Sequence, residues 1–323
     1  FGFVLWSLSS PAKNLNTGAS GINDIYTPYK IEGWKDAWQT DKEYDGADLS
    51  DNALVEANNI DFGTKTSIAP RLGSSVVGAT STSAYPIYSM HTSKDINGRE
   101  LMLRTSTGTI EWYNEINSSW ENLDDGYTIN KQFSFADGNN SSETNIYTYF
   151  SNGAEAIKRF RVAFGSVKSN NSAELTINSV SGYTDLGNLG FSTSTGTIRI
   201  GGTNYTYAST SGWTFGGMTL PALTANSGVI SSVETSGFTS APPTASAIVI
   251  KDQRLYAAYK NSVYCSKIDA LQDFSYSAPR TAGEGEIAFF PDGGQKINGL
   301  GIRPEYVAVM KDDYIGALEF KDL

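Results

Sequence analysis

The sequence predicts an all-β protein, most simply a β-propeller whose blades need not all lie within this chain. It also predicts an inserted small β domain and a non-repeating N-terminal arm. Three observations predict this class. One antiparallel hairpin pattern recurs four times, an apolar strand precedes each copy, and no long stretch has helical periodicity. A three-strand pattern repeated in this way is typical of a radial repeat, of which the propeller is the commonest all-β form.

The hairpin pattern is clearest at Lys251–Ser266, where apolar residues alternate with small or polar ones on both sides of a turn at Lys260 and Asn261. Alternation of period two predicts half-buried strands, and a short polar turn predicts that they pair antiparallel. The other copies turn at Thr107–Gly108, Ser151–Gly153 and Lys311–Asp313. The four preceding apolar strands start near Pro86, Lys131, Ser246 and Lys296.

The spacing of the copies predicts the domain organisation. The intervals from Pro86 to Lys131 and from Ser246 to Lys296 match the roughly 40 to 50 residues of one propeller blade. The interval from Lys131 to Ser246 exceeds one blade by about 65 to 70 residues, which predicts an insertion. We therefore expect an arm (1–55), a first set of blades (56–165), an inserted small β domain (166–242) and a second set of blades (243–323).

Composition and net charge restrict the classes of function that are expected. The chain has 323 residues and a net charge of -10, so nonspecific phosphate binding is not expected as its main task. The acidic balance fits a solvated surface or, alternatively, the lining of a conduit along which nucleic acid slides. Cys265 is the only cysteine, so no intrachain disulfide can form, and the alternating pattern predicts a buried thiol.

The ends of the chain give no targeting signal. The apolar segment that starts at Phe1 is too short to span a bilayer and has no basic flank, so no membrane span is expected. The chain starts without methionine and stops at Leu323 directly after a hairpin. Further blades could therefore lie outside this numbering.

The arm contains two tryptophans in a polar setting, followed by an acidic cluster. The segment from Asp41 to Gly46 matches the first half of an EF-hand calcium loop, but Asn52 stands where the closing glutamate is needed. We therefore interpret the cluster as a solvated acidic arm, with metal binding as the alternative. Exposed aromatics beside charge suit a subunit contact. The predicted assembly residues are Trp34, Trp38, Asp41, Asp45, Asp48 and Asp51.

The insertion is low in charge and rich in Ser, Thr and Gly. Short alternating strands such as GTIRIGG and TNYTYAS, separated by glycine-containing turns, predict a small β domain rather than a linker. Insertions of this kind are tolerated in propeller loops. If the domain is exposed on the rim, Tyr207 and Trp213 are candidates for stacking against a ligand.

The sequence offers little for catalysis. His91 is the only histidine, which excludes a metal site of several imidazoles, and no nucleophile elbow, P-loop or dinucleotide motif occurs. Three carboxylate pairs, Asp124 with Asp125, Glu284 with Glu286 and Asp312 with Asp313, are too close in sequence to predict the separation that a glycosidase needs. The sialidase box is missing too. We predict no enzyme activity, catalytic residue, cofactor or metal, and keep glycan hydrolysis as an alternative.

Two segments resemble β-propeller virion proteins of tailed bacteriophages. The first is ANNIDF (Ala57–Phe62) followed by Pro70, Arg71 and Gly73, a pair that in those proteins precedes the first blade. The second is the hairpin with RLY at 254–256, Val263, Tyr264 and Ser266, followed by Asp269 and Phe274. The resemblance covers roughly 53–164 and 246–320. The phrase TGTIRIGGTNYTY also resembles small β modules inserted into phage tail proteins.

This resemblance implies a structural protein of the virion tail, similar to the tail-tube nozzle proteins. It implies a homo-oligomeric ring that contacts other tail proteins and lets DNA pass through its lumen without sequence-specific binding. The alternative is a carbohydrate- or receptor-binding module of a phage tail or cell surface, with a host glycan or receptor as partner.

Overall fold

The computed structural model describes residues 60–64, 67–70, 86–140, 144–276, 284–290, 296–312 and 315–318. Every described element is a β-strand, which confirms the predicted all-β class. The chain forms two compact units, Phe1–Ser75 and Val76–Leu323. In the first unit, β1 (Ile60–Thr64) pairs antiparallel with β2 (Ser67–Pro70). The described residues contain no helix long and apolar enough to cross a membrane.

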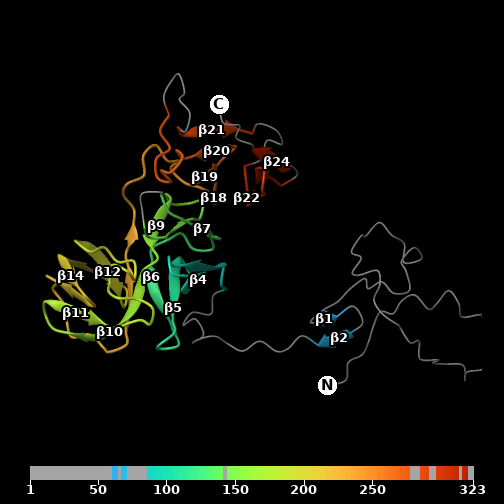
Figure 1. Ribbon diagram of the computed structural model, residues 1–323. Helices are drawn as coiled ribbons and strands as arrows, with labels where there is room; N and C mark the ends of the chain where they lie inside the picture. Colours follow the sequence, from blue (N-terminus) through green and yellow to red (C-terminus); the bar gives the residue numbers. More distant parts are fainter. Residues whose placement is uncertain are drawn as a thin grey trace, which may run out of the picture. The chain divides into compact units, whose positions relative to one another are not determined.

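Sheet 1 of the second unit has four antiparallel strands in chain order (Figure 1). They are β3 (Ser89–Lys94), β4 (Glu100–Ser106), β5 (Thr109–Asn114) and β6 (Ser119–Asp124). The turn between β4 and β5 is the predicted one, with positive φ at Thr107 and Gly108. A Cβ at Gly108 would collide with the Tyr127 carbonyl, so both backbone conformation and space favour glycine there.

Sheet 2 is completed by a strand from beyond the insertion. Its order is β17 (Val233–Glu234), β9 (Lys158–Arg161), β8 (Tyr147–Ser151) and β7 (Ser134–Gly138). The chain therefore leaves this sheet after its third strand and returns to add the fourth. Between β9 and β17 the chain forms a separate sheet whose last strand ends at Ser231, and the expected domain boundary at 242 stays a prediction.

Sheets 3 and 4 follow the same plan. Sheet 3 runs in chain order through β18 (Ala247–Lys251), β19 (Arg254–Tyr259), β20 (Ser262–Cys265) and β21 (Glu286–Phe289). Sheet 4 has three described strands, β22 (Gly299–Ile302), β23 (Val307–Met310) and β24 (Ile315–Leu318). All four predicted hairpins are thus confirmed, each with its preceding strand.

The four sheets pack face to face in succession. One core joins sheets 1 and 2 through Leu103, Trp112 and Phe150, and a second joins sheets 2 and 3 through Tyr149 and Leu255. A third core joins sheets 3 and 4 around Cys265, which is buried as predicted. Burying each large side chain stabilises the fold by about 1.5 to 3 kcal/mol. The described residues thus form several separate antiparallel sheets that do not close into a ring, and the propeller stays a prediction.

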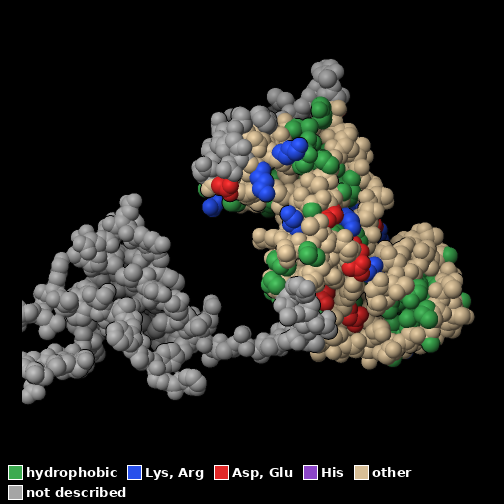
Figure 2. All heavy atoms as spheres, turned by 180° about the vertical axis from the view of Figure 1, so that it is seen from behind, with side chains coloured by type: hydrophobic (Ala, Val, Ile, Leu, Met, Phe, Trp, Pro, Cys, Tyr) green, Lys and Arg blue, Asp and Glu red, His purple; other side chains and the backbone are tan. Residues whose placement is uncertain are grey.

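The insert is a seven-stranded sheet bent around its central strand. Its order is β13 (Thr203–Tyr207), β12 (Gly196–Ile200), β16 (Gly228–Ser231), β10 (Phe164–Asn170), β11 (Glu174–Ile177), β15 (Thr214–Gly216) and β14 (Ser209–Ser211). The register shifts within β10, between Val167 and Ser169, and the two halves share one core. Tyr207 of one half lies 4.8 Å from Phe215 of the other, measured between ring centroids. Figure 2 shows few charged side chains on the visible face of the insert.

Candidate functional site

Serine hydroxyls join the first strands of successive sheets. Ser89 at the start of β3 accepts a hydrogen bond from Phe133 N at 2.8 Å and donates to Phe133 O at 3.0 Å. Ser134 at the start of β7 likewise accepts from Ile248 N at 3.0 Å and donates to Ile248 O at 3.2 Å. Each hydroxyl satisfies main-chain groups of a residue in, or directly before, the first strand of the next sheet, as buried backbone groups require.

The third junction uses the same residue type. Ser246, directly before β18, donates to Ile297 O at 2.7 Å, and Ile297 belongs to the core between sheets 3 and 4. We call Ser89, Ser134 and Ser246 the serine clips. They place β3, β7, β18 and β22 side by side, so the four sheets are joined along one edge.

The insert is held on sheet 1 by two clusters of contacts. In the first, Tyr183 of the insert donates to the Asp95 carboxylate at 2.5 Å, and Arg99 lies over the Phe164 ring with 3.8 Å to its centroid. Burial, followed by the hydrogen bond and charge of Asp95, raises the pKa of Tyr183 to about 12. Burial also lowers the pKa of Arg99, against the favourable effects of Tyr183 and nearby carboxylates.

In the second cluster, the Glu121 carboxylate of β6 accepts from Gly228 N at 2.9 Å and from Asn114 Nδ2 at 2.6 Å. Asn114 also donates to Asn226 O at 3.1 Å, and the neighbouring Asn117 donates to the same oxygen at 2.8 Å. A Cβ at Gly228 would collide with Trp112 and Glu121. The start of β16 therefore sits directly on sheet 1.

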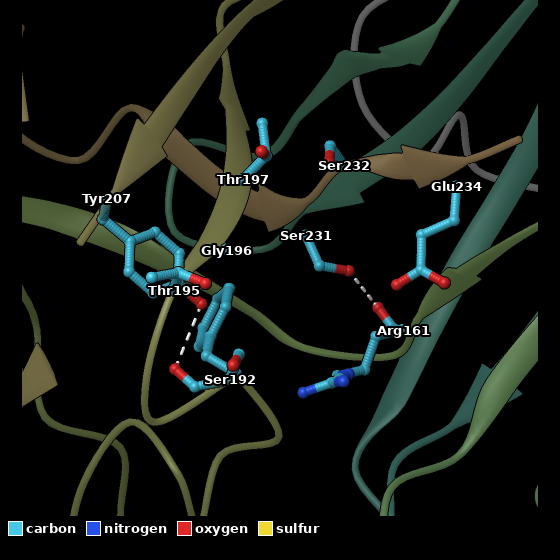
Figure 3. Close-up of a pocket in the computed structure, with 10 residues that line it drawn as sticks. Arg161, Ser192, Thr195, Gly196, Thr197, Tyr207, Ser231, Ser232 and Glu234 are labelled. Carbon is cyan, nitrogen blue, oxygen red and sulfur yellow. Dashed lines mark hydrogen bonds between the residues drawn. The ribbon is translucent and has the colours of Figure 1, made fainter. Parts of the chain in front are cut away.

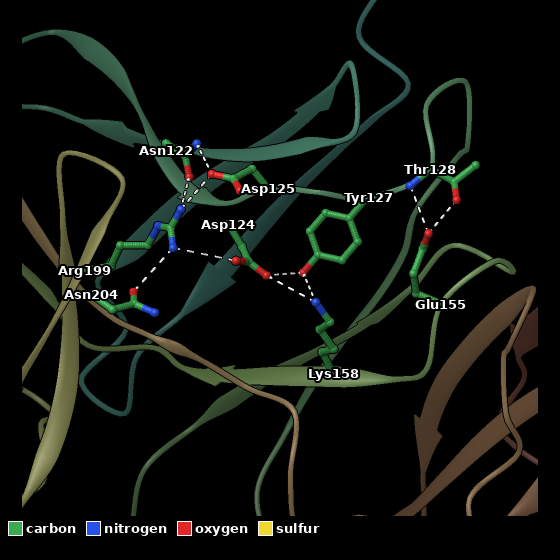
Figure 4. A network of polar contacts seen from close by, with 9 residues as sticks. All are labelled: Asn122, Asp124, Asp125, Tyr127, Thr128, Glu155, Lys158, Arg199 and Asn204. Carbon is green, nitrogen blue, oxygen red and sulfur yellow. Dashed lines mark hydrogen bonds and ion pairs between the residues drawn. The ribbon is translucent and has the colours of Figure 1, made fainter.

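A polar network connects sheet 1, sheet 2 and the insert (Figure 4). Arg199 of β12 binds Asp125 at 2.8 Å and Asp124 at 3.8 Å, and Lys158 of β9 lies 3.4 Å from Asp124. Tyr127 donates to Asp124, and Lys158 lies over the Tyr127 ring. Burial raises the pKa of Tyr127, and the negative charge of Asp124 raises it further.

The predicted carboxylate pair Asp124 and Asp125 is thus engaged by two cations. These carboxylates form ion pairs with Arg199 and Lys158, and the pairs hold sheet 1, sheet 2 and the insert together. Among the residues described, no group of three or more His, Cys, Asp or Glu could hold a metal ion.

A pocket of about 230 Å³ lies between the insert and sheet 2 (Figure 3). Sheet 2 contributes Arg161 of β9 and Glu234 of β17, and the insert contributes the rings of Phe191 and Tyr207. The remaining lining residues are small, and all except Gly196 carry a hydroxyl: Ser192, Thr195, Gly196, Thr197, Ser231 and Ser232. The pocket forms because the chain passes directly from β16 of the insert into β17 of sheet 2, so a surface of the insert faces a surface of sheet 2.

The charged groups of this pocket are fixed by neighbours in sheet 2. Arg161 donates to the Tyr147 hydroxyl at 2.8 Å and to Gly190 O at 3.4 Å. Glu234 forms an ion pair with Arg159 at 2.8 Å. Tyr207 donates to Ser192 O at 3.1 Å. Burial raises the pKa of Tyr207, while the positive charge of Arg161 opposes that rise.

The structure changes the interpretation of one predicted stacking residue. Tyr207 is only 2% exposed and packs against Phe215 in the insert core, so it is not an open surface platform. Its buried ring lines the pocket instead. Trp213 is half-buried against the same core. Ligand stacking at Trp213 stays a prediction.

The predicted assembly residues lie outside the described residues, namely Trp34, Trp38, Asp41, Asp45, Asp48 and Asp51. His91 occupies a structural position, since its Nε2 lies 3.0 Å from Asp137 and its ring stacks on Phe135 at 5.1 Å. Asp137 also accepts hydrogen bonds from Ser93 and Thr148, so this group ties β3 to β7.

Sequence reasoning did not find the serine clips, the polar network or the pocket. Each joins residues that are far apart in the chain, and the only signal for the clips was a serine at the start of three apolar strands. No known protein-family model matches the chain, and no curated protein matches it.

Proposed function

We propose that this chain is a structural component of a tailed-phage virion, a tail or nozzle protein that forms a homo-oligomeric ring around the DNA channel. The supporting observation is the succession of antiparallel sheets joined by three apolar cores and by the serine clips. Such a body resists deformation because each sheet is held through both side-chain packing and main-chain hydrogen bonds.

The resemblance to phage propeller proteins supports the placement of this rigid body in the virion tail. The matching residues Arg254 and Ser266 have a clear structural task, since Arg254 donates to Ser266 O at 2.7 Å and to Glu284 O at 2.8 Å. They fasten β19, the end of β20 and the segment before β21. A net charge of -10 suits a ring through which DNA slides, because an acidic wall repels phosphates.

The test is the size and shape of the full chain in solution. Light scattering should give a mass several times that of the 34.8 kDa chain, and electron microscopy should show rings with an open centre. Trp34→Ala with Trp38→Ala should shift the chain to smaller species, and Trp6→Ala in the same arm is the matched control. A chain that stays monomeric at all concentrations and with tail extracts would refute the proposal.

The second candidate, a carbohydrate- or receptor-binding module, is favoured by the pocket between the insert and sheet 2. Adsorption to host cells that disappears with Trp213→Ala or with Ser232→Tyr in the pocket, while ring assembly is unchanged, would support that role. Loss of assembly with unchanged adsorption would support the structural role alone.

A further inference from the structure

The pocket between the insert and sheet 2 has the dimensions of a site for one small molecule. Its volume of about 230 Å³ is below the roughly 300 to 1,000 Å³ of sites for drug-sized ligands. Its lining combines two aromatic residues with several residues that carry hydroxyl groups. Aromatic surface beside many neutral hydrogen-bonding groups suits a compact ligand that has both apolar faces and hydroxyls, such as a sugar.

The charges of the pocket are not balanced. Glu234 is neutralised by Arg159, its ion-pair partner at 2.8 Å. Arg161 contacts only neutral oxygens, those of Tyr147 and Gly190, and no carboxylate of the described residues lies within ion-pair distance of it. One guanidinium therefore faces the pocket without a matching anion. An arginine held in this way favours a carboxylate, which it binds by charge-assisted hydrogen bonds.

We propose that this pocket binds one acidic sugar residue, with its carboxylate on Arg161 and its hydroxyls on Glu234 and on the serine and threonine side chains. The glutamate accepts hydrogen bonds from sugar hydroxyls and repels a second negative charge, so it distinguishes a hydroxylated monocarboxylate from a simple polyanion. The rings of Phe191 and Tyr207 form the apolar wall. The site would let the chain hold an acidic polysaccharide. It rests on the second candidate function, carbohydrate binding, and does not depend on the architectural role.

The test uses the full chain with galacturonate as the probe and galactose and acetate as comparison ligands. Saturation-transfer NMR shows which ligand contacts the protein, and titration calorimetry gives the affinity. Galacturonate should bind, and galactose and acetate should each bind at least about tenfold more weakly, because each lacks one of the two sets of contacts. Galactose binding as tightly as galacturonate would refute the role of Arg161, and acetate binding as tightly would show an anion site only.

Two pairs of variants connect the binding to this pocket. Arg161→Gln should weaken galacturonate binding by at least about tenfold, whereas Lys168→Gln, an exposed cation of the insert outside the pocket, should leave it unchanged. Ser232→Tyr should block the pocket, and Thr203→Tyr at an exposed position of β13 is its control. Thermal unfolding of each variant confirms that it is folded. The proposal fails if the wild type binds none of the three probes, or if Arg161→Gln and Ser232→Tyr both fold and bind normally.

Discussion

At the scale of single residues, Gly228 decides how closely the insert approaches sheet 1. Its backbone N–H donates to Glu121, and any Cβ would enter the space of Trp112 and the Glu121 carboxylate. Trp112 belongs to the core between sheets 1 and 2 and cannot move without disturbing it. A shift of the Glu121 carboxylate would break its hydrogen bonds to Gly228 and Asn114. In the sequence Gly228 is one glycine among 32, and nothing local distinguishes it.

We expect Gly228→Ala to lower the free energy of unfolding by about 1 to 3 kcal/mol, as overpacking of a core does. Denaturant unfolding followed by tryptophan fluorescence measures this, because Trp112 lies at the contact. Gly299→Ala is the control, since a Cβ there makes only ordinary contacts with Met310. Equal effects of the two substitutions would contradict the close approach at Gly228.

Tyr183 makes the free energy of unfolding fall as the pH rises into the alkaline range. Its pKa is raised to about 12 by burial and by Asp95, whereas an unfolded tyrosine has a pKa of about 10. The folded state holds the phenolic proton more tightly, so this contribution is complete below pH 10 and is lost as the pH rises toward 12. Buried Tyr127, whose pKa is also raised, acts in the same direction.

Tyr183→Phe should therefore lower stability by about 1 kcal/mol at pH 8, where it removes the hydrogen bond to Asp95. The difference from the wild type should shrink at pH 11. Denaturant midpoints at both pH values measure it, with exposed Tyr276→Phe as the control. A difference that stays constant with pH would show that Tyr183 does not titrate as stated.

At the scale of elements, the serine clips explain how separate sheets become one body. A strand at the edge of a sheet leaves main-chain groups without partners, and neighbouring sheets that meet face to face cannot supply them through a ladder. The hydroxyl of Ser134 meets this need by bonding both N and O of Ile248, which is itself buried. The alternating pattern predicted β7 and β18 correctly, but it contained no information that a hydroxyl would join them.

Ser134→Ala should cost about 1 to 3 kcal/mol, because the buried Ile248 N–H loses its partner. Hydrogen exchange should show faster exchange of the Ile248 amide, a result that loss of packing elsewhere would not give. Ser119→Ala at the start of β6 is the matched control, since the structure records no hydrogen bond of its hydroxyl among the described residues. Unchanged exchange at Ile248 would refute the role of the clip.

At the scale of the whole molecule, the insert enters and leaves sheet 2 at adjacent points. Phe164 of β10 pairs with Ile230 of β16, and Ser231 N donates to Ala163 O at 3.0 Å. A domain whose two ends are neighbours can be removed without displacing the strands that flank it. β9 and β17 would keep their pairing, because it lies outside the insert.

Replacing residues 164–230 with Gly-Gly should therefore give a folded chain that retains sheets 1 to 4. The variant should unfold at lower temperature, because Phe164 and Ile230 leave the core between sheets 1 and 2 and each contributed about 1.5 to 3 kcal/mol. Circular dichroism and thermal unfolding measure both effects. An excised chain that is unfolded or aggregated would show that the insert is required for the sheets to form.

The sequence by itself determined the all-β class and the four hairpins with their turns. Alternation and turn residues act between neighbours in the chain, so the hairpins at Thr107–Gly108 and at Lys260–Asn261 were predictable. Only the tertiary structure decided that β17 belongs to sheet 2, that Tyr207 is buried and that Arg161 and Glu234 share a pocket. These outcomes depend on contacts across the insertion, and a local pattern cannot specify which distant surface a side chain will meet.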